Sequence, residues 1–483
     1  MRIKLDNFYK YLLIFAGIFL PTQAFFVLVL HLPSVFQMLY IFLIAGIIAL
    51  LFTPLKQILL SQNKFVISLW IFLLIALMLS CIHNYTDLFN HGLGYYHYTS
   101  KYFSSFWDTI PMRLFNWGFL RPFLFFLYVV ILFVLLKTEK LRKILLKTLI
   151  IVALVSSIYS VYQIIATFFC LPFGSLFSGH NGNEIFIAPG VRRCEGIFYE
   201  AGPQATFLSP IFCVLLTQLF EKNLSNVFFS KTKTLVAFML VSIALFFTFS
   251  PIAFLTFVLT PLILTIINIK KIRHFKIKKK YFYLILILGC AFVTIIVMGI
   301  FKIKNSMNFD VNTYMLEKIA KSLYSMDDPF VYTNADSRSV RNYVGICEYK
   351  DNKLFGVGPG AAINYYYRYA PFTTWNLMLS TEGVINTHIK MLCETGIVGF
   401  IPYLLLILYP LFLCIKKYKS ILKSKNNLLI QGLLIGYILY IFLSYQATLE
   451  FFKSYFWMIY ILLITEIKKE KYYIKNLSFK EEK

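Results

Sequence analysis

Long apolar runs, separated by short polar or basic links, occupy most of the chain. A helix that crosses a bilayer needs about 20 mostly apolar residues. The runs are continuously apolar rather than alternating, which excludes a transmembrane β-barrel. Helices remain, because every backbone polar group in lipid must be paired within its own segment. We therefore predict an all-α polytopic membrane protein with about twelve transmembrane helices, at 11–30, 35–52, 65–82, 119–136, 145–170, 204–220, 234–249, 251–269, 281–301, 388–414, 428–445 and 451–467.

Two of these predictions carry alternatives. The runs 234–249 and 251–269 are short and meet at Ser250–Pro251, so a single re-entrant hairpin is the other interpretation. The first run, 11–30, follows a basic start, as a signal peptide does. It is too long for a signal-peptide core and lacks a small-residue cleavage site, so we predict a retained helix.

The composition supports a membrane protein. Hydrophobic residues make up 59% of the 483 positions and charged residues 14%, against about 25% charged in soluble domains. The formal net charge of +25 would suit nucleic acid, but Lys and Arg gather in short links, which is the positive-inside pattern. We therefore expect no nucleic-acid partner. Both termini and the basic segments are predicted to be cytoplasmic: 1–10, 137–147, 270–280, 415–427 and the tail after Thr465.

The long loops are predicted to lie on the side of the membrane opposite the cytoplasm. The predicted organisation comprises helices 1–9 within 1–301, with external loops 83–118 and 171–203, then an external loop 302–387, helices 10–12 within 388–467, and a basic tail 468–483. The loop between helices 9 and 10 has 86 residues, and loops of that length are usually functional. Within it we expect short helices around 311–325 and 338–350.

The first group of candidate residues is R-C-E-G-I-F-Y-E-A-G-P at 193–203, preceded by Arg192. An arginine at a membrane edge is costly unless it is paired or hydrated. Its planar guanidinium suits the oxygens of a diphosphate. The alternative is that Arg193 pairs with Glu195 or Glu200.

The second group lies in the long loop. Arg338 and Arg341 belong to D-S-R-S-V-R, and G-V-G-P-G follows with Gly356, Gly358 and Gly360. Glycines permit a tight turn and close backbone approach. The spacing is too short for a dinucleotide fingerprint, and alone it is typical of an ordinary turn.

The third group opens the tenth predicted helix. Asn386 and His388 precede E-T-G-I-V-G, which begins at Glu394. A carboxylate in an apolar stretch is a functional candidate, and the alternative is a polar clamp between helices. His388 is a candidate proton shuttle or an ordinary interfacial histidine.

Taken in order, these three groups resemble the O-antigen ligase and polymerase family of bacterial envelopes, over roughly 190–400. The resemblance implies a lipid-donor glycosyltransferase of GT-C-like architecture on the outer face of the bacterial cytoplasmic (inner) membrane. It implies sugars carried on undecaprenyl diphosphate, with no cofactor and no metal. By matched position, Arg193 and Arg338 neutralise the diphosphate as catalytic residues. Further substrate-binding positions are Arg192, Arg341, Gly356, Gly358, Gly360, Asn386 and His388.

One departure from the family pattern separates its two activities. Ligases of the family typically place a histidine directly before the Asn that opens the tenth helix, and this chain has Ile385 there. The substitution favours a repeat-unit polymerase for O antigen or capsule, with a chain-length regulator as a candidate partner. The alternatives are a ligase that transfers the finished glycan to lipid A core or protein and, more remotely, a flippase or transporter. The acceptor hydroxyl needs a base, for which Glu200 is the first choice and Glu195 and His388 are reserves.

Overall fold

The computed structural model describes part of the chain. The described residues are 2–21, 37–91, 115–169, 171–172, 186–188, 191–198, 200–221, 229–274, 337–362, 365, 369, 384–424, 426–444 and 451–481. The predicted span 281–301 and the predicted short helix 311–325 lie outside them. The predicted short helix at 338–350 is confirmed, because a helix covers Ser337–Asp351.

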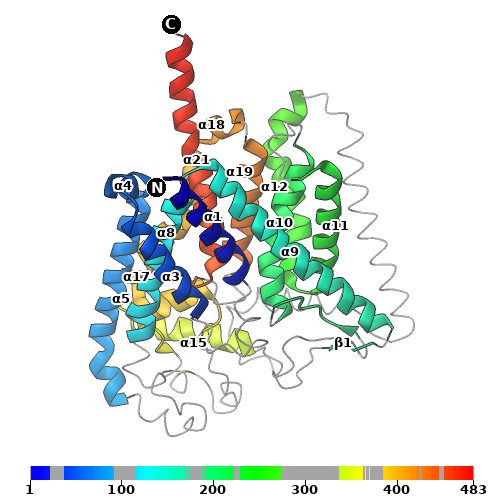
Figure 1. Cartoon of the computed structure of the whole chain (residues 1–483). Coiled ribbons are helices and arrows are strands. Elements are labelled where there is room, and N and C mark those ends of the chain that lie inside the picture. Colours follow the sequence, from blue (N-terminus) through cyan, green and yellow to red (C-terminus); the bar gives the residue numbers. More distant parts are fainter. Residues whose placement is uncertain are drawn as a thin grey trace.

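The described residues are almost entirely helical (Figure 1). In chain order the elements are α1 (Arg2–Phe19), α3 (Gln37–Leu51), α4 (Leu55–Ser61), α5 (Lys64–His91), η2 (Asn116–Leu120), α8 (Arg121–Leu135), α9 (Glu139–Phe168), β1 (Phe186–Ala188), β2 (Val191–Arg192), α10 (Ala201–Leu219), α11 (Lys231–Phe247), α12 (Pro251–His274), α15 (Ser337–Asp351), α17 (Thr387–Lys416), α18 (Tyr418–Lys423), α19 (Asn427–Leu439), η5 (Tyr440–Ser444) and α21 (Ser454–Glu481). The all-α prediction needs one correction: β1 and β2 form a short antiparallel hairpin in which Phe186 is opposite Arg192.

The long apolar helices agree with a multi-pass membrane protein. Among the described residues, six helical stretches are long and apolar enough to cross a membrane: Lys64–Tyr85, Asn116–Leu135, Glu139–Thr167, Pro251–Asn268, Thr387–Lys416 and Asn427–Ser444. Five other predicted spans overlap the shorter or less apolar helices α1, α3, α10, α11 and α21. Helix α5 continues to His91, beyond the predicted end at 82.

The bundle has two distinct ends. The hairpin and α15 lie at one end, below the bundle in Figure 1, whereas α18 and the C-terminal part of α21 lie at the other. At the α18 end, Lys417 Nζ donates to Ile467 O at 3.1 Å, and Lys137 Nζ donates to Gln57 Oε1 at 3.2 Å. The basic links around 137–147 and 415–427 therefore share one end, and the hairpin and α15, from the two predicted external loops, share the other.

Helix α10 lies in the middle of the packed core, and nearly all its residues are buried. It contacts α19 closely because α19 presents glycines: a Cβ on Gly432 would lie 2.4 Å from Thr217 Oγ1, and one on Gly436 2.7 Å from Pro210 Cα. Small residues allow such approach between helices in lipid. The Thr256 hydroxyl on α12 also donates to Ser209 Oγ on α10 at 2.9 Å.

A buried ion pair joins α9 to α21 at the α18 end. Arg142 Nε donates to Glu466 Oε1 at 2.5 Å, and both side chains are 4% exposed. The guanidinium also donates to Leu136 O at 3.1 Å, and Asn426 Nδ2 donates to Glu466 Oε2 at 3.0 Å. Hydrogen bonds to both side chains add to the ion pair, which links the two helices.

Candidate active site

Helix α17 is broken at Gly396, whose backbone (φ 59°, ψ −165°) is not helical. The N–H groups of Ile397 and Val398 would ordinarily donate to carbonyls four residues earlier in the helix. They donate instead to Lys353 O at 2.9 Å and to Leu354 O at 3.2 Å. The break therefore depends on a segment more than 40 residues earlier in the chain.

The carbonyls of α17 that lose their helical donors accept hydrogen bonds from the same segment. The N–H of Val357 donates to Cys393 O at 2.9 Å, and the N–H of Gly358 donates to Glu394 O at 3.0 Å. Two helical hydrogen bonds are thus lost, and their two N–H groups and two carbonyls form four bonds to the 353–358 segment. From α5, the Ser80 hydroxyl donates to Glu394 O at 3.0 Å and joins a third element to the break.

This exchange of hydrogen bonds explains why two positions beside the break are glycine. Gly356 and Gly396 both have positive φ, +67° and +59°. A Cβ on Gly356 would lie 2.4 Å from Cys393 O, and one on Gly396 would lie 2.2 Å from Leu354 O. Both obstacles are backbone atoms that cannot swing away. The G-V-G-P-G and E-T-G-I-V-G motifs therefore form one structural unit in which glycine is required sterically.

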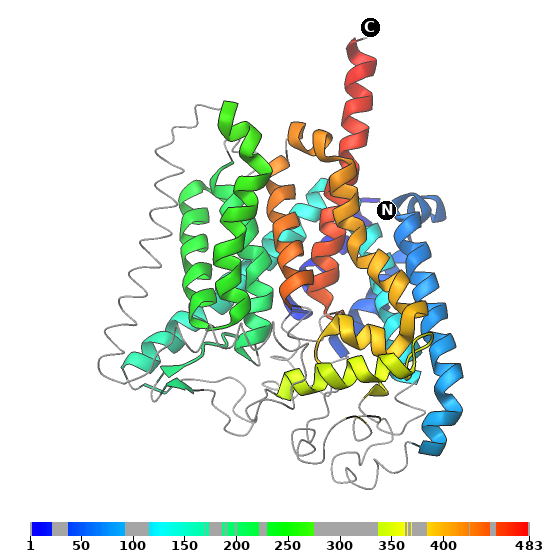
Figure 2. The same cartoon turned by 180° about the vertical axis from the view of Figure 1, so that it is seen from behind.

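Helix α15 runs parallel to the first half of α17, beside the break (Figure 2). Asn342 Oδ1 accepts from the N–H of Asn386 at 3.1 Å. One turn later, a Cβ on Gly345 would lie 3.0 Å from the Ile389 side chain. The Asn386 side chain caps α17 by accepting from the N–H groups of His388 and Ile389 at 2.9 and 3.2 Å. Asn386 therefore has a structural role, and its contact with substrate stays a prediction.

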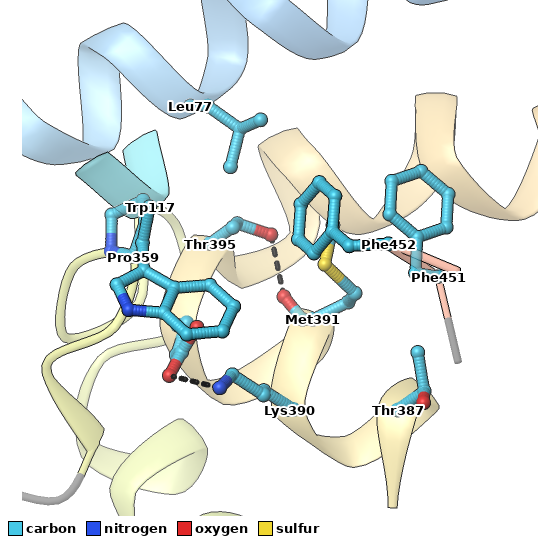
Figure 3. Close-up of a pocket in the computed structure, with 10 residues that line it drawn as sticks. Leu77, Trp117, Pro359, Thr387, Lys390, Met391, Thr395, Phe451 and Phe452 are labelled. Atoms are coloured by element: carbon cyan, nitrogen blue, oxygen red, sulfur yellow. Dashed lines mark hydrogen bonds and ion pairs between the residues drawn. The ribbon is translucent and has the colours of Figure 1, made fainter. Parts of the chain in front are cut away.

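A small pocket lies against the break (Figure 3). Lys390 Nζ lies 3.7 Å from Glu394 Oε1 and 4.2 Å from the centre of the Trp117 ring. The guanidinium of Arg121 lies 4.0 Å from the same ring. Other lining residues are apolar apart from two threonines: Leu77, Pro359, Thr387, Met391, Thr395, Phe451 and Phe452. The pocket thus combines an ion pair with aromatic walls.

A second buried carboxyl group lies behind the pocket. Glu348, on α15, is 0% exposed, and neither of its side-chain oxygens has a hydrogen-bond partner among the described residues. Its neighbours are the Cys393 thiol and the Glu394 carboxylate. Burial and then the nearby Glu394 carboxylate raise the pKa of Glu348 well above its usual range. These surroundings favour the protonated form of the Glu348 carboxyl group.

His388 ties α17 to neighbouring elements. Its Nε2 lies 3.0 Å from Ile441 O in η5, and its Nδ1 lies 2.9 Å from the Tyr403 hydroxyl. A neutral ring satisfies both contacts if Nε2 donates and Nδ1 accepts. This geometry supports a clamp between helices, and a proton-shuttle role for His388 stays a prediction.

The R-C-E-G segment lies against the end of α11. Arg193 Nε donates to Thr248 O at 2.8 Å, and the N–H of Cys194 donates to Phe247 O at 3.0 Å. A cation beside the last carbonyls of a helix is stabilised by its dipole. Gln163 Oε1 on α9 accepts from the N–H groups of Glu195 and Gly196 at 3.1 and 3.0 Å, so α9 and α11 together position the arginine.

The remaining predicted residues occupy different surroundings. Glu200 is exposed and directly precedes α10. Arg192 is in β2, and Arg338 is in the first turn of α15. Arg341, one turn further along α15, is 6% exposed. Gly358 and Gly360, like Gly356, have positive φ and shape the turn beside α17, so the three glycines are confirmed as a turn while their contact with substrate is untested.

The sequence singled out Glu394 as a functional candidate, but Lys390, Trp117 and Glu348 were missed. Lys390 and Glu394 are four residues apart, a spacing that places both on one helix face and could have indicated the ion pair. Trp117 and Glu348 had no comparable signal, since their elements meet α17 only through the tertiary fold. Over the part of the chain that the structure describes, no group of three His, Cys, Asp or Glu side chains is arranged to hold a metal.

Comparison with known proteins shows a family resemblance over part of the chain. Residues 236–404 match the family model described as O-antigen ligase. The match supports the resemblance to the O-antigen ligase and polymerase family and indicates ligase- or polymerase-type activity. The matched stretch, about a third of the chain, contains Arg338, the glycine turn and the break of α17, whereas Arg193 precedes it. A comparison with curated proteins found no match.

Proposed function

We propose that this protein is a surface-polysaccharide polymerase, which joins oligosaccharide repeat units carried on undecaprenyl diphosphate at the outer face of the bacterial inner membrane. The family match supports glycosyl transfer, and the start of α17 favours polymerase over ligase. Ile385 occupies the position of the ligase histidine and is 8% exposed. The nearest histidine, His388, is engaged at both ring nitrogens. This apolar, buried Ile385 is the observation that carries the choice.

The membrane orientation follows from charge. The basic links gather at the α18 end, which the positive-inside rule places in the cytoplasm. The β1–β2 hairpin, α15 and the pocket are then on the outer side. A GT-C-like arrangement of about twelve helices accommodates these elements, and both termini are cytoplasmic.

The reaction we propose is a direct displacement. The acceptor hydroxyl oxygen forms a bond to the anomeric carbon of the donor, and the bond from that carbon to the diphosphate oxygen breaks. The electron pair stays with the lipid diphosphate, and the hydroxyl proton goes to a carboxylate, for which Glu200 is the choice made from the sequence. No metal or cofactor takes part in this proposal.

Arginines supply the electrostatic contribution. Negative charge grows on the diphosphate as the bond breaks, and preorganised cations aimed at such charge are typically the largest catalytic effect. We assign this role to Arg193 and Arg338, with Arg192 and Arg341 as further contacts. Arg193 is already held at the end of α11, so little reorganisation is needed when the charge develops.

The test is the surface glycan of a host strain that lacks the chromosomal copy. Wild type, Arg193→Ala and Arg338→Ala are returned at matched membrane abundance. We expect a ladder with wild type and, for each variant, about 10²–10³-fold slower transfer, by analogy with the loss of one oxyanion-stabilising group. At that rate the ladder collapses to a single repeat unit.

Other results would contradict the proposal. Polymer that accumulates on the carrier lipid in the deletion strain, with no attached glycan, would identify a ligase. A ladder that is unchanged by deletion would reject both activities and favour transport. Full rescue by both arginine variants would reject these arginines while keeping the polymerase.

A further inference from the structure

The break of α17 brings two carboxyl groups together, and their surroundings differ sharply. The Glu394 carboxylate has Lys390 Nζ at 3.7 Å and also accepts from the backbone N–H groups of Gly360 and Ala362. Each of these contacts stabilises the ionised form. Glu394 is therefore provided with one cation and two oriented N–H donors.

Glu348 has none of these partners. In the described part of the chain both its oxygens lack a hydrogen bond, and the Cys393 thiol beside it already donates to Lys390 O at 3.3 Å. An isolated ionised carboxylate in such surroundings costs far more than a neutral acid. A second negative charge beside Glu394 would add repulsion. Of the two groups, Glu348 therefore holds the proton and Glu394 is the carboxylate.

The charged and titratable groups around this pair come from several elements. Lys390 and Cys393 belong to α17, Glu348 to α15, and Cys81 of α5 lies near Glu394. Across the pocket, Arg121 and Lys390 lie over the two-ringed side chain of Trp117. The cluster thus contains two cations, one carboxylate and one neutral acid.

Glu394 also lines the pocket together with Trp117, Phe451 and Phe452. Aromatic rings beside a carboxylate suit a sugar, because the rings cover its C–H faces and the carboxylate accepts from a hydroxyl. Glu348 does not line the pocket. One carboxyl group therefore faces the space a ligand would enter, and the other supports it from behind.

We propose that Glu394 is the base that accepts the proton of the acceptor sugar hydroxyl, and that Glu348 is a permanently protonated positioning residue behind it. The assignment rests on the glycosyl transfer proposed above. In the step, the hydroxyl O–H bond breaks and an O–H bond forms on Glu394, while the sugar oxygen bonds to the anomeric carbon and the diphosphate leaves with its electron pair. Lys390 stabilises Glu394 before the transfer. Glu394 takes the place of Glu200 in this role.

The closing experiment applies the same chemical change to both carboxyl groups. Glu394→Gln and Glu348→Gln are expressed in the deletion strain at matched membrane abundance. Glu394→Gln should slow chain growth by about 10²–10⁴-fold, the usual contribution of a positioned base. Glu348→Gln should change it by no more than a few fold, because glutamine replaces a neutral acid of nearly the same shape.

Two readouts separate chemistry from folding. The thermal midpoint of each purified variant should stay near that of wild type, and the residual rate of Glu394→Gln should lose the rise with pH that wild type shows as its base ionises. A ladder that persists in Glu394→Gln would reject the role of Glu394 as the base. Collapse of the ladder in Glu348→Gln at normal abundance and midpoint would overturn the neutral positioning role.

A measurement that does not use activity separates this inference from the polymerase itself. In purified full-length protein, the infrared carbonyl band of a protonated carboxylic acid should be present at neutral pH, and Glu348→Gln should remove it. Absence of that band from wild type would overturn the assignment even if the protein polymerises glycan. Deletion could leave the ladder unchanged while the band is present in wild type and lost in Glu348→Gln. The polymerase function and the role of Glu394 as base would then be rejected, and the assignment of the proton to Glu348 would stand.

Discussion

Gly396→Ala is the sharpest test of the broken helix. The native backbone at Gly396, φ 59° and ψ −165°, lies in a region that is essentially restricted to glycine, and a residue with a Cβ loses of order 1–3 kcal/mol there. The new Cβ would also lie 2.2 Å from Leu354 O, a backbone atom. The 353–354 segment must then move away from α17.

That movement breaks the two nearest exchanged bonds, which run from the N–H groups of Ile397 and Val398 to Lys353 O and Leu354 O. Each of the two N–H groups of α17 that is left buried without a partner costs about 1–3 kcal/mol. Added to the backbone strain, the total is about 3–9 kcal/mol. Native proteins are stable by only about 5–15 kcal/mol, so the variant should be severely destabilised.

The assay is the thermal midpoint of the protein purified in detergent, followed by tryptophan fluorescence, together with its abundance in membranes. Gly202→Ala is the matched control, because Gly202 lies in the first turn of α10 and a Cβ there meets nothing within 4 Å. We expect a large drop of the midpoint for Gly396→Ala and none for Gly202→Ala. Equal midpoints for Gly396→Ala and wild type would refute the bond exchange at the break.

Two further predictions concern the ion pair and a buried thiol. Arg142→Ala should destabilise the protein by about 3–5 kcal/mol because it leaves Glu466 buried and unpaired, whereas the double variant Arg142→Met with Glu466→Leu should recover most of that loss. A midpoint for the double variant as low as that of Arg142→Ala would contradict the pairing. Burial, and then the neighbouring Glu195, raise the pKa of the Cys194 thiol to about 12, so its thiolate appears only as the pH approaches that value. A maleimide at pH 8 should therefore leave Cys194 unlabelled until the protein is denatured, and rapid labelling of the folded protein would contradict this.

The membrane-spanning character of this protein follows from the sequence by itself. A helix in lipid forms most of its backbone hydrogen bonds within its own segment, so the length and composition of an apolar run suffice to identify it. The basic links are equally local, and the described links around 137–147 and 415–427 lie at one end of the bundle. The order of the motifs also pointed to the family whose model matches residues 236–404.

The break of α17 could not be predicted from the local sequence. The stretch after Asn386 is apolar and typical of one continuous helix, because the groups that interrupt it are carbonyls and N–H groups of residues 353–358. Likewise, the protonation proposed for Glu348 depends on the surroundings that Cys393 and Glu394 provide, which exist only when α15 packs on α17. Local sequence cannot specify the partners of a buried charge.

The tertiary structure also decided which polar residues are already occupied. Arg193 is held by Thr248 O, and His388 by Tyr403 and Ile441 O, although all of these partners except Tyr403 lie more than 50 residues away. The sequence determined which side chains can bind or transfer a proton, because that is a property of the residue type. The fold decided where they lie and what they contact, because burial and hydrogen bonding arise from distant segments that pack together.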